Sequence, residues 1–176
     1  MVGTAMDGFK FKPVVIGKSQ NPRCFKDVNR DELPVYYYSS KNAWMTREIF
    51  WDWFLDHFIY EVNEHYGEDT TVHLLLDNCA AHPPKEQLGE MFPNIQIWML
   101  PPNTTALIQP MDQGVIMVLK SKFKSCYYKK LVEYTMDNRQ IFLKVDPFTE
   151  FLKTYSILDA IYNIDKAWQS IDSVLI

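Results

Sequence analysis

The chain has 176 residues, of which 47% are hydrophobic, 15% aromatic and 23% charged, and its formal net charge is −4. These values are those of an ordinary globular domain. The acidic balance excludes a general nucleic-acid coat, so binding of DNA or RNA needs a local basic patch. We expect no membrane span, because no apolar run approaches roughly 18 residues. We also expect no signal peptide, because the first residues lack a basic region and a long apolar stretch.

The first half of the chain predicts short strands and one long helix. Residues 1–5 and 9–16 are expected to form a hairpin across a turn at Asp7-Gly8. Residues 17–29 are a loop rich in turn formers, and residues 35–38 predict another short strand. Thr46 is a suitable N-cap for a helix that runs to about residue 65, because apolar side chains then repeat at helical spacing.

The second half alternates buried strands with helices. Residues 72–76 and 95–100 are continuous apolar runs of strand length, typical of strands that are covered on both faces. A short helix is expected over residues 83–91, and a long amphipathic helix over residues 115–134. This order of elements predicts a mixed α/β layer architecture.

The last part of the chain predicts a turn followed by a helix. Asp146-Pro147 is expected to be the turn. Ser156 and Asp159 have the spacing of a capping box at the start of the final helix. An apolar stripe on that helix includes Ile161 and Trp168, so one of its faces is expected to be buried.

Two carboxylates at the ends of predicted core elements are the strongest chemical signal. Asp77 follows the strand of residues 72–76, and Asp112 lies at the mouth of the long helix. Carboxylate oxygens suit Mg²⁺ and Mn²⁺, so the pair is a candidate metal site for phosphodiester chemistry, which usually needs a third carboxylate. On residue type alone, Asp77 could start a turn and Asp112 could cap a helix, and the capping role is compatible with metal binding.

The segment from Leu74 to Ile116 carries three blocks of residues, with sequences LLLDNCAAHP, LPPNTT and QPMDQGVI. These blocks resemble the DDE superfamily endonuclease domain of pogo, Tigger and Jerky-type transposases and transposon-derived proteins. Further similar residues lie at 12–25 and 160–168, so the resemblance covers most of the chain. The three blocks together are a specific signal, whereas a single Asp would be a weak one.

The resemblance implies a ribonuclease-H-like fold, with a mixed sheet flanked by helices. Residues 1–135 would form the endonuclease core, and residues 136–176 a helical extension of the same domain. The family places one Asp on a central strand, a second at the end of another strand and a third at the start of a later helix. Asp77 matches the second and Asp112 the third. The implied chemistry is cleavage and strand transfer of DNA by two Mg²⁺ or Mn²⁺ ions roughly 4 Å apart.

The family's first Asp has no match in this sequence. It is expected in a central strand upstream of the segment that residues 1–16 resemble, and Asp7 is a poor substitute at a hairpin tip. Either the chain is incomplete at its amino terminus, or the lineage has lost the site and kept a non-catalytic, DNA-associated scaffold or regulator. In both cases we expect no robust catalysis by the chain alone. Without that strand, its neighbours would expose unpaired edges and apolar faces, so we expect aggregation or loose packing.

The remaining candidates surround the two carboxylates. Asn78 and His82 are expected either to support Asp77 as a metal ligand or to contact substrate. His82 could contact a substrate phosphate or a metal, or be a structural hydrogen-bonder, and Asn78 could orient Asp77 or make a turn. Basic side chains on the long helix and in the early loop are candidates for DNA phosphates or for a solvated face. The DNA-binding candidates are Lys120, Lys122, Lys124 and Arg23, and Lys129 and Lys130 belong to the same helical cluster.

The resemblance also implies DNA as the partner and the nucleus as the location, with a homodimer as a further expectation. The three cysteines are odd in number and lack a CxxC spacing, which favours a reducing compartment over a disulfide framework. No membrane and no small-molecule cofactor are expected.

Overall fold

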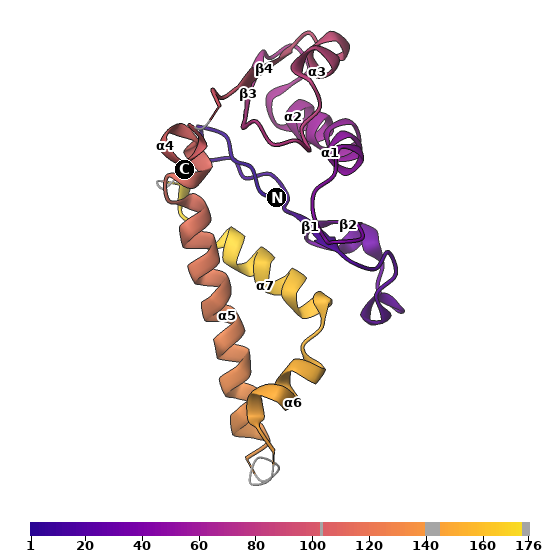
Figure 1. Cartoon of the computed structure of the whole chain (residues 1–176), viewed down its shortest axis with the longest axis vertical. Helices are drawn as coiled ribbons and strands as arrows, with labels where there is room; N and C mark the ends of the chain where they lie inside the picture. Colours follow the sequence, from indigo (N-terminus) through magenta and orange to yellow (C-terminus); the bar gives the residue numbers. More distant parts are fainter. Residues whose placement is uncertain (103, 140–144, 174–176) are drawn as a thin grey trace.

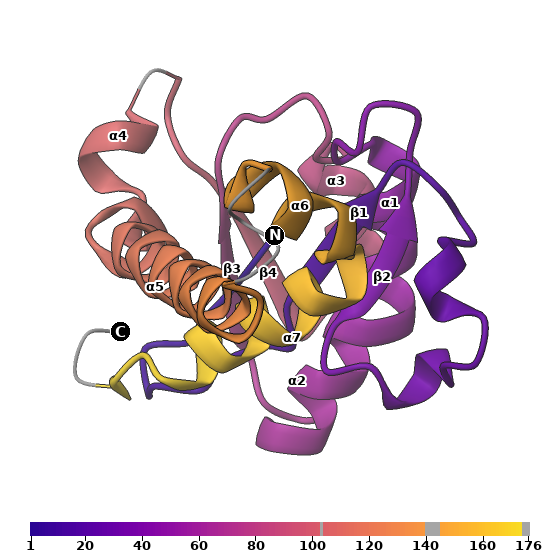
Figure 2. The ribbon, with the colours of Figure 1, turned by 90° about the horizontal axis from the view of Figure 1, so that it is seen from below.

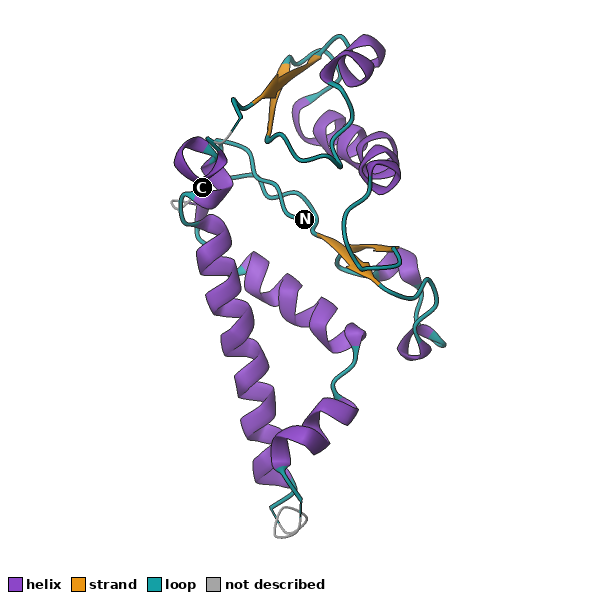
Figure 3. Cartoon of the chain, viewed as in Figure 1, coloured by secondary structure: helices purple, strands orange, loops and turns teal. Residues whose placement is uncertain are grey.

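The computed structural model describes residues 1–102, 104–139 and 145–173. It confirms a mixed α/β fold that contains helices and two small parallel sheets (Figure 3). Figure 1 shows β3 and β4 with α1–α3 at one end of the molecule, and the long helix α5 with α6 and α7 at the other. Within the described residues, no helix is long and apolar enough to cross a membrane.

The amino-terminal hairpin is present, but its first segment is not a strand. Thr4 and Lys10 form an isolated antiparallel bridge, and the Ala5 N–H donates to the Phe9 carbonyl (2.9 Å). Only Val14–Gly17 becomes a strand, β1, and it pairs in parallel with β2, Tyr36–Ser39. The hairpin continues past Pro13, because the Val14 N–H donates to the Met1 carbonyl (2.9 Å) and the Met1 amino group donates to the Val14 carbonyl (2.8 Å). The Pro13 carbonyl accepts from the Tyr36 N–H (2.8 Å), which begins the pairing with β2.

The predicted long helix is confirmed as one continuous helical run. It consists of α1 (Arg47–Trp53), a π-helical turn η3 (Phe54–Phe58) and α2 (Ile59–Tyr66). The Thr46 side chain accepts from the Ile49 N–H (3.3 Å), as expected of an N-cap.

Two parallel strands and a short helix follow. Strand β3 covers Val72–Leu76, and its parallel neighbour β4 covers Ile95–Met99. Helix α3 covers Lys85–Met91 and starts two residues later than predicted, because Pro84 has an extended backbone with ψ 138°. Among the described residues β3 pairs with β4 alone, so the expected single sheet is replaced by two separate pairs.

The carboxyl-terminal half is helical. Short α4 (Thr105–Ile108) and η4 (Pro110–Asp112) lead into α5 (Val115–Asp137), which is confirmed and three residues longer than predicted. α6 (Pro147–Thr154) and α7 (Ile157–Gln169) complete the chain, and Figure 2 shows α7 alongside α5. The division of the domain at residue 135 stays a prediction.

The expected turn at Asp146-Pro147 is wrong, because this pair begins helix α6. The Asp146 side chain accepts from the Thr149 N–H (2.7 Å), and Pro147 occupies the first helical position, where its missing N–H costs nothing. The capping box of α7 is confirmed: the Asp159 N–H donates to the Ser156 hydroxyl (3.3 Å) and the Ser156 N–H to the Asp159 carboxylate (2.9 Å).

Three buried clusters hold these elements. The first lies between α1–α2, β3, β4 and the amino-terminal segment, and its buried members include Phe11, Phe58 and Leu76. The second joins the start of α5 to the end of α7 through residues that include Val115 and Trp168. The third packs α7 on the β1–β2 region. The predicted apolar stripe of α7 is confirmed, because Ile161 and Trp168 have no exposed surface.

Candidate active site

Asp77 lies immediately after β3 and adopts a defined orientation. Its carboxylate oxygen Oδ1 accepts from the Cys79 N–H (3.2 Å), which is the local turn expected of an Asx residue. The same oxygen lies 3.2 Å from Nδ1 of His82. About a third of the side chain (31%) is exposed, so the carboxylate is both held in place and accessible to solvent.

His82 and Asn78 brace the loop that carries Asp77. Nδ1 of His82 also lies 2.8 Å from the Asp77 carbonyl, and its ring packs on Phe50 at 4.7 Å between centroids. The Asn78 amide donates to the Leu100 carbonyl, which ties the end of β3 to the end of β4. His82 is thus placed to orient Asp77, whereas Asn78 bridges two strand ends, and the part of either residue in binding substrate stays a prediction.

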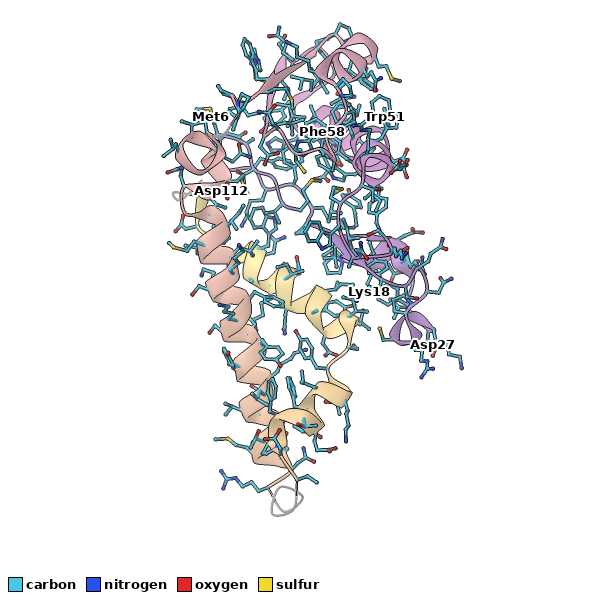
Figure 4. The ribbon with its side chains drawn as sticks, viewed as in Figure 1. Met6, Lys18, Asp27, Trp51, Phe58 and Asp112 are labelled. Atoms are coloured by element: carbon cyan, nitrogen blue, oxygen red, sulfur yellow. The ribbon has the colours of Figure 1, made fainter. Side chains whose placement is uncertain are left out.

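Asp112 is the last residue of η4 and is exposed at the head of α5 (Figure 4). The expectation that it caps the long helix is wrong, because the N-cap is Gly114, which has no side chain. The chain turns at Gly114 with φ +127°, and this turn separates the carboxylate from the first residue of α5.

A groove of about 510 Å³ runs along one face of α5 from Asp112. Asp112, Ile116, Met117, Lys120, Ser121 and Lys124 line it. Residues four apart on a helix share a face, which explains why Lys120 and Lys124 lie in line with the carboxylate. The groove thus has an acidic residue at one end and two lysines along its length.

The other basic candidates do not line this groove. Lys130 pairs with Asp159 of α7 (2.9 Å), and Lys129 lies 4.0 Å from Glu133 on the exposed surface of α5. Lys122 does not line the groove. Arg23 belongs to η1 (Arg23–Phe25). This turn lies in the segment between Lys18 and Asp27, which projects on the side of the molecule away from Asp112 (Figure 4).

The described residues do not by themselves fit a two-ion centre. Asp77 and Asp112 offer the hard oxygen ligands that Mg²⁺ and Mn²⁺ prefer. Within residues 1–102, 104–139 and 145–173, however, no three His, Cys, Asp or Glu side chains gather as a metal site. Asp7 is engaged at the hairpin tip, where the Phe9 N–H (2.9 Å) and the Tyr66 hydroxyl (2.9 Å) donate to it and lower the pKa of its carboxyl.

Comparison with known proteins places the chain in a family. A family model described as DDE superfamily endonuclease matches residues 1–176. The chain therefore belongs to the DDE superfamily endonucleases, and its homologues are Tigger and Jerky proteins. The human Tigger transposable element-derived protein 7 is 37% identical over 179 residues, which cover 95% of this chain and 32% of the relative.

Two further relatives have similar coverage. The mouse Tigger transposable element-derived protein 4 is 33% identical over 172 residues, 97% of this chain and 29% of its own length. The mouse Jerky protein is 32% identical over 178 residues, 98% of this chain and 28% of its own length. The chain thus spans less than a third of these relatives. No solved structure matches it.

Sequence reasoning missed part of the site. Met117 and Ser121 line the groove with Asp112, and the Arg47 guanidinium reaches the Ala80 carbonyl (3.5 Å) beside the loop of Asp77. Met117 gave no signal in the sequence, because an apolar residue on a helix is expected to be buried, and only the structure shows that 69% of it is exposed. Arg47 gave none either, because a basic residue after an N-cap is common on any helix.

Proposed function

We propose that this chain is the main part of a ribonuclease-H-like endonuclease domain that cleaves DNA phosphodiester bonds with divalent metal ions. Asp77 and Asp112 serve as two of its three catalytic, metal-holding carboxylates. The observation that carries the proposal is the α5 groove, where Asp112 shares one surface with Lys120 and Lys124. An acidic residue that holds a metal and basic residues that neutralise phosphates are the two requirements of such a site.

The position of Asp77 supports the same proposal. His82 and the Cys79 N–H hold its carboxylate in one orientation, and an oriented carboxylate loses less entropy when it binds a metal. A bound divalent ion would supply the Lewis acid that stabilises the leaving oxygen and activates the attacking water or 3′-hydroxyl. Asp77 and Asp112 would hold it, and Lys120 and Lys124 would hold the DNA strand beside it.

The open edge of β3 is where a third carboxylate fits the fold. β3 has β4 on one side, and the backbone groups of His73 and Leu75 face the other side, because Val72 and Leu76 bond toward β4. A strand supplied upstream of residue 1 would pair there and complete a mixed sheet. An Asp on that strand would lie next to the end of β3, close to Asp77.

The decisive experiment is a plasmid-nicking assay with Mn²⁺, using protein that includes the sequence upstream of residue 1. We expect nicking by the parent and its loss in Asp77→Asn and Asp112→Asn, which keep the side-chain size but remove the charge. Lys129→Ala, a lysine of α5 that faces Glu133, should nick like the parent. Equal nicking by the parent and both Asn variants would refute the catalytic assignment.

A second candidate function is a non-catalytic scaffold that binds DNA. The observation that favours it is the presence of two carboxylates and no three-ligand cluster among the described residues. This function predicts that DNA binding survives Asp77→Asn unchanged while nicking is absent from every version of the protein. In both functions DNA is the partner and the nucleus the place of action, and a homodimer stays a prediction.

A further inference from the structure

The two candidate carboxylates are attached to different buried clusters. Leu76, next to Asp77, belongs to the cluster under β3 and β4. Met111, next to Asp112, and Val115 belong to the cluster between α5 and α7. The spacing of the carboxylates therefore depends on whatever joins these two clusters.

The amino-terminal segment is that link. Figure 1 shows it crossing between the β3–β4 end of the molecule and the α5–α7 pair. The Phe11 side chain is buried in the first cluster, where its ring lies 5.2 Å from that of Phe58. The Phe11 carbonyl accepts from the indole N–H of Trp168 (3.0 Å), and Trp168 is fully buried in the second cluster. One residue thus touches both clusters, through its ring on one side and its backbone on the other.

Lys10 contacts the same end of α7 that carries Trp168. Its ammonium group donates to the carbonyls of Trp168 (3.2 Å), Gln169 (3.0 Å) and Ile171 (3.1 Å), at the carboxyl end of α7. The Trp168 carbonyl also accepts from the Ile171 N–H (3.2 Å), and a cation favours the negative end of the helix dipole. Lys10 therefore fixes the end of α7 directly beneath the segment that contains Phe11.

Two further contacts show that the segment and the α5–α7 pair fit closely. The Thr4 hydroxyl lies 3.2 Å from the Met111 sulfur, one residue before Asp112. A Cβ atom added to Gly8 would lie 2.8 Å from the Cβ of Ser173, so the backbones approach too closely for a larger residue there. The head of α5 is thus held by the same segment that enters the first cluster.

We propose that Phe11, Trp168 and Lys10 form a positioning junction that sets the distance between Asp77 and Asp112. The inference rests on the proposed function, because that function is what requires the two carboxylates to be spaced for a shared metal centre. None of the three residues touches DNA or metal in this role. They act through the clusters that carry the two acids.

The spacing can be measured without any catalysis. Spin labels are attached to the native, exposed Cys79 and to Met117→Cys, in a background with Cys24→Ser and Cys126→Ser. Pulsed electron resonance then gives the distance distribution between the two sites in the 176-residue chain. Lys10→Met removes the ammonium at similar size, and Trp168→Phe removes the indole donor while keeping a ring.

The matched control is Lys12→Met. Lys12 lies two residues from Lys10, but its ammonium group sits over the Tyr36 ring, 4.8 Å from the centroid. We expect one narrow distance in the parent and in Lys12→Met, and a broader or shifted distribution in Lys10→Met and Trp168→Phe. Thermal melts identify any variant that fails to fold. If one of the two variants does not fold, the distance distribution of the other tests the junction. An unchanged distribution in every folded variant would overturn the junction.

A kinetic readout separates positioning from general stability. In the nicking protein, a displacement on the order of 1 Å is expected to lower kcat by roughly 10²-fold. The KM for DNA should stay unchanged in Lys10→Met, whereas Lys120→Ala should raise it. A rise of KM without a fall of kcat in Lys10→Met would contradict the inference. If the parent does not nick DNA at all, the proposed function fails, and the distance measurement still decides on the junction.

Discussion

Gly114 is the residue on which the position of Asp112 depends locally. Its φ of +127° lies in a region that residues with a Cβ rarely adopt. A Cβ added there would meet no atom within 4 Å, so a substitution would disturb the backbone alone. Because Asp112 is two residues away, strain at Gly114 should be relieved by moving the carboxylate.

Gly114→Ala is therefore expected to lower the free energy of unfolding by about 1 kcal/mol and to weaken DNA binding. Gly67→Ala is the matched control, because Gly67 has φ +86° and also has no atom within 4 Å of its Cβ position, but it ends α2. Urea titrations should show a similar loss of stability in both variants. If Gly114→Ala binds DNA as the parent does, the backbone conformation at Gly114 does not control the DNA-binding site.

The basic residues of α5 differ in what they can contribute. Lys120 and Lys124 line the groove with Asp112, whereas Lys129 lies 4.0 Å from Glu133. A lysine that is already near a carboxylate gains less from a phosphate, because the two anions compete for it. The groove lysines should therefore account for most of the electrostatic binding.

Lys120→Ala and Lys124→Ala should each lower the affinity for double-stranded DNA. Each should also reduce the slope of log K against log salt by about 0.9, the value for one phosphate contact. Lys129→Ala should leave both quantities close to those of the parent. The measurement is fluorescence anisotropy with a labelled duplex at several salt concentrations, and equal effects of all three variants would argue for a diffuse basic surface.

At the scale of elements, the start of α7 shows how charge and capping act together. The Asp159 carboxylate accepts from the Ser156 hydroxyl (2.7 Å) and from Lys130 of α5 (2.9 Å). Burial alone would raise the pKa of Asp159, but these hydrogen bonds outweigh it and bring the pKa below its ordinary value of 3.8. The same side chain thus starts α7 and ties it to α5.

Asp159→Asn should destabilise the protein by about 1 kcal/mol at neutral pH, because a neutral amide binds the Lys130 ammonium and the Ser156 donors more weakly than a carboxylate does. Folding lowers the pKa of this carboxyl, so its stabilising effect is present above about pH 3.8 and is lost as the pH falls below that value. The difference between parent and variant in urea unfolding should therefore shrink in acid. Asp165→Asn, on the same helix, is the control, and a difference that does not shrink as the pH falls below 3.8 would contradict this account.

At the scale of the whole molecule, the β3–β4 sheet is incompletely covered. Its buried face packs on the helices, but on the other face Leu75 is 44% exposed and Trp98 is 56% exposed. Among the described residues the outer edge of β3 has no partner strand. An exposed apolar face beside an unpaired edge favours association with other chains.

The 176-residue chain is expected to associate as its concentration rises, so a cooperative melt of the monomer should be seen only in dilute solution. Leu75→Lys adds a charge beside the open edge and should shift size-exclusion profiles toward the monomer. Tyr60→Lys, on α2 and 64% exposed, is the control and should not. A sharp melt from a parent that stays monomeric at high concentration would show that the edge is protected.

Local signals were enough to predict several elements and both acids. Thr46, Ser156 and the apolar runs at β3 and β4 act through neighbours in sequence, so their effects can be read without a tertiary structure. The same reasoning failed at Asp146-Pro147, where a turn and a helix start use the same residue types. It also failed for β1, because the pairing of that strand depends on a segment far along the chain.

The sequence by itself determined the family, the two carboxylates and most of the helices and strands, because motifs and periodicity are local properties. Only the tertiary structure decided that Lys120 and Lys124 share a groove with Asp112 and that Lys130 is engaged by Asp159 of α7. It alone placed Phe11 against Trp168, across nearly the whole chain. Such contacts depend on how elements pack in space, and no local pattern of residues specifies that packing.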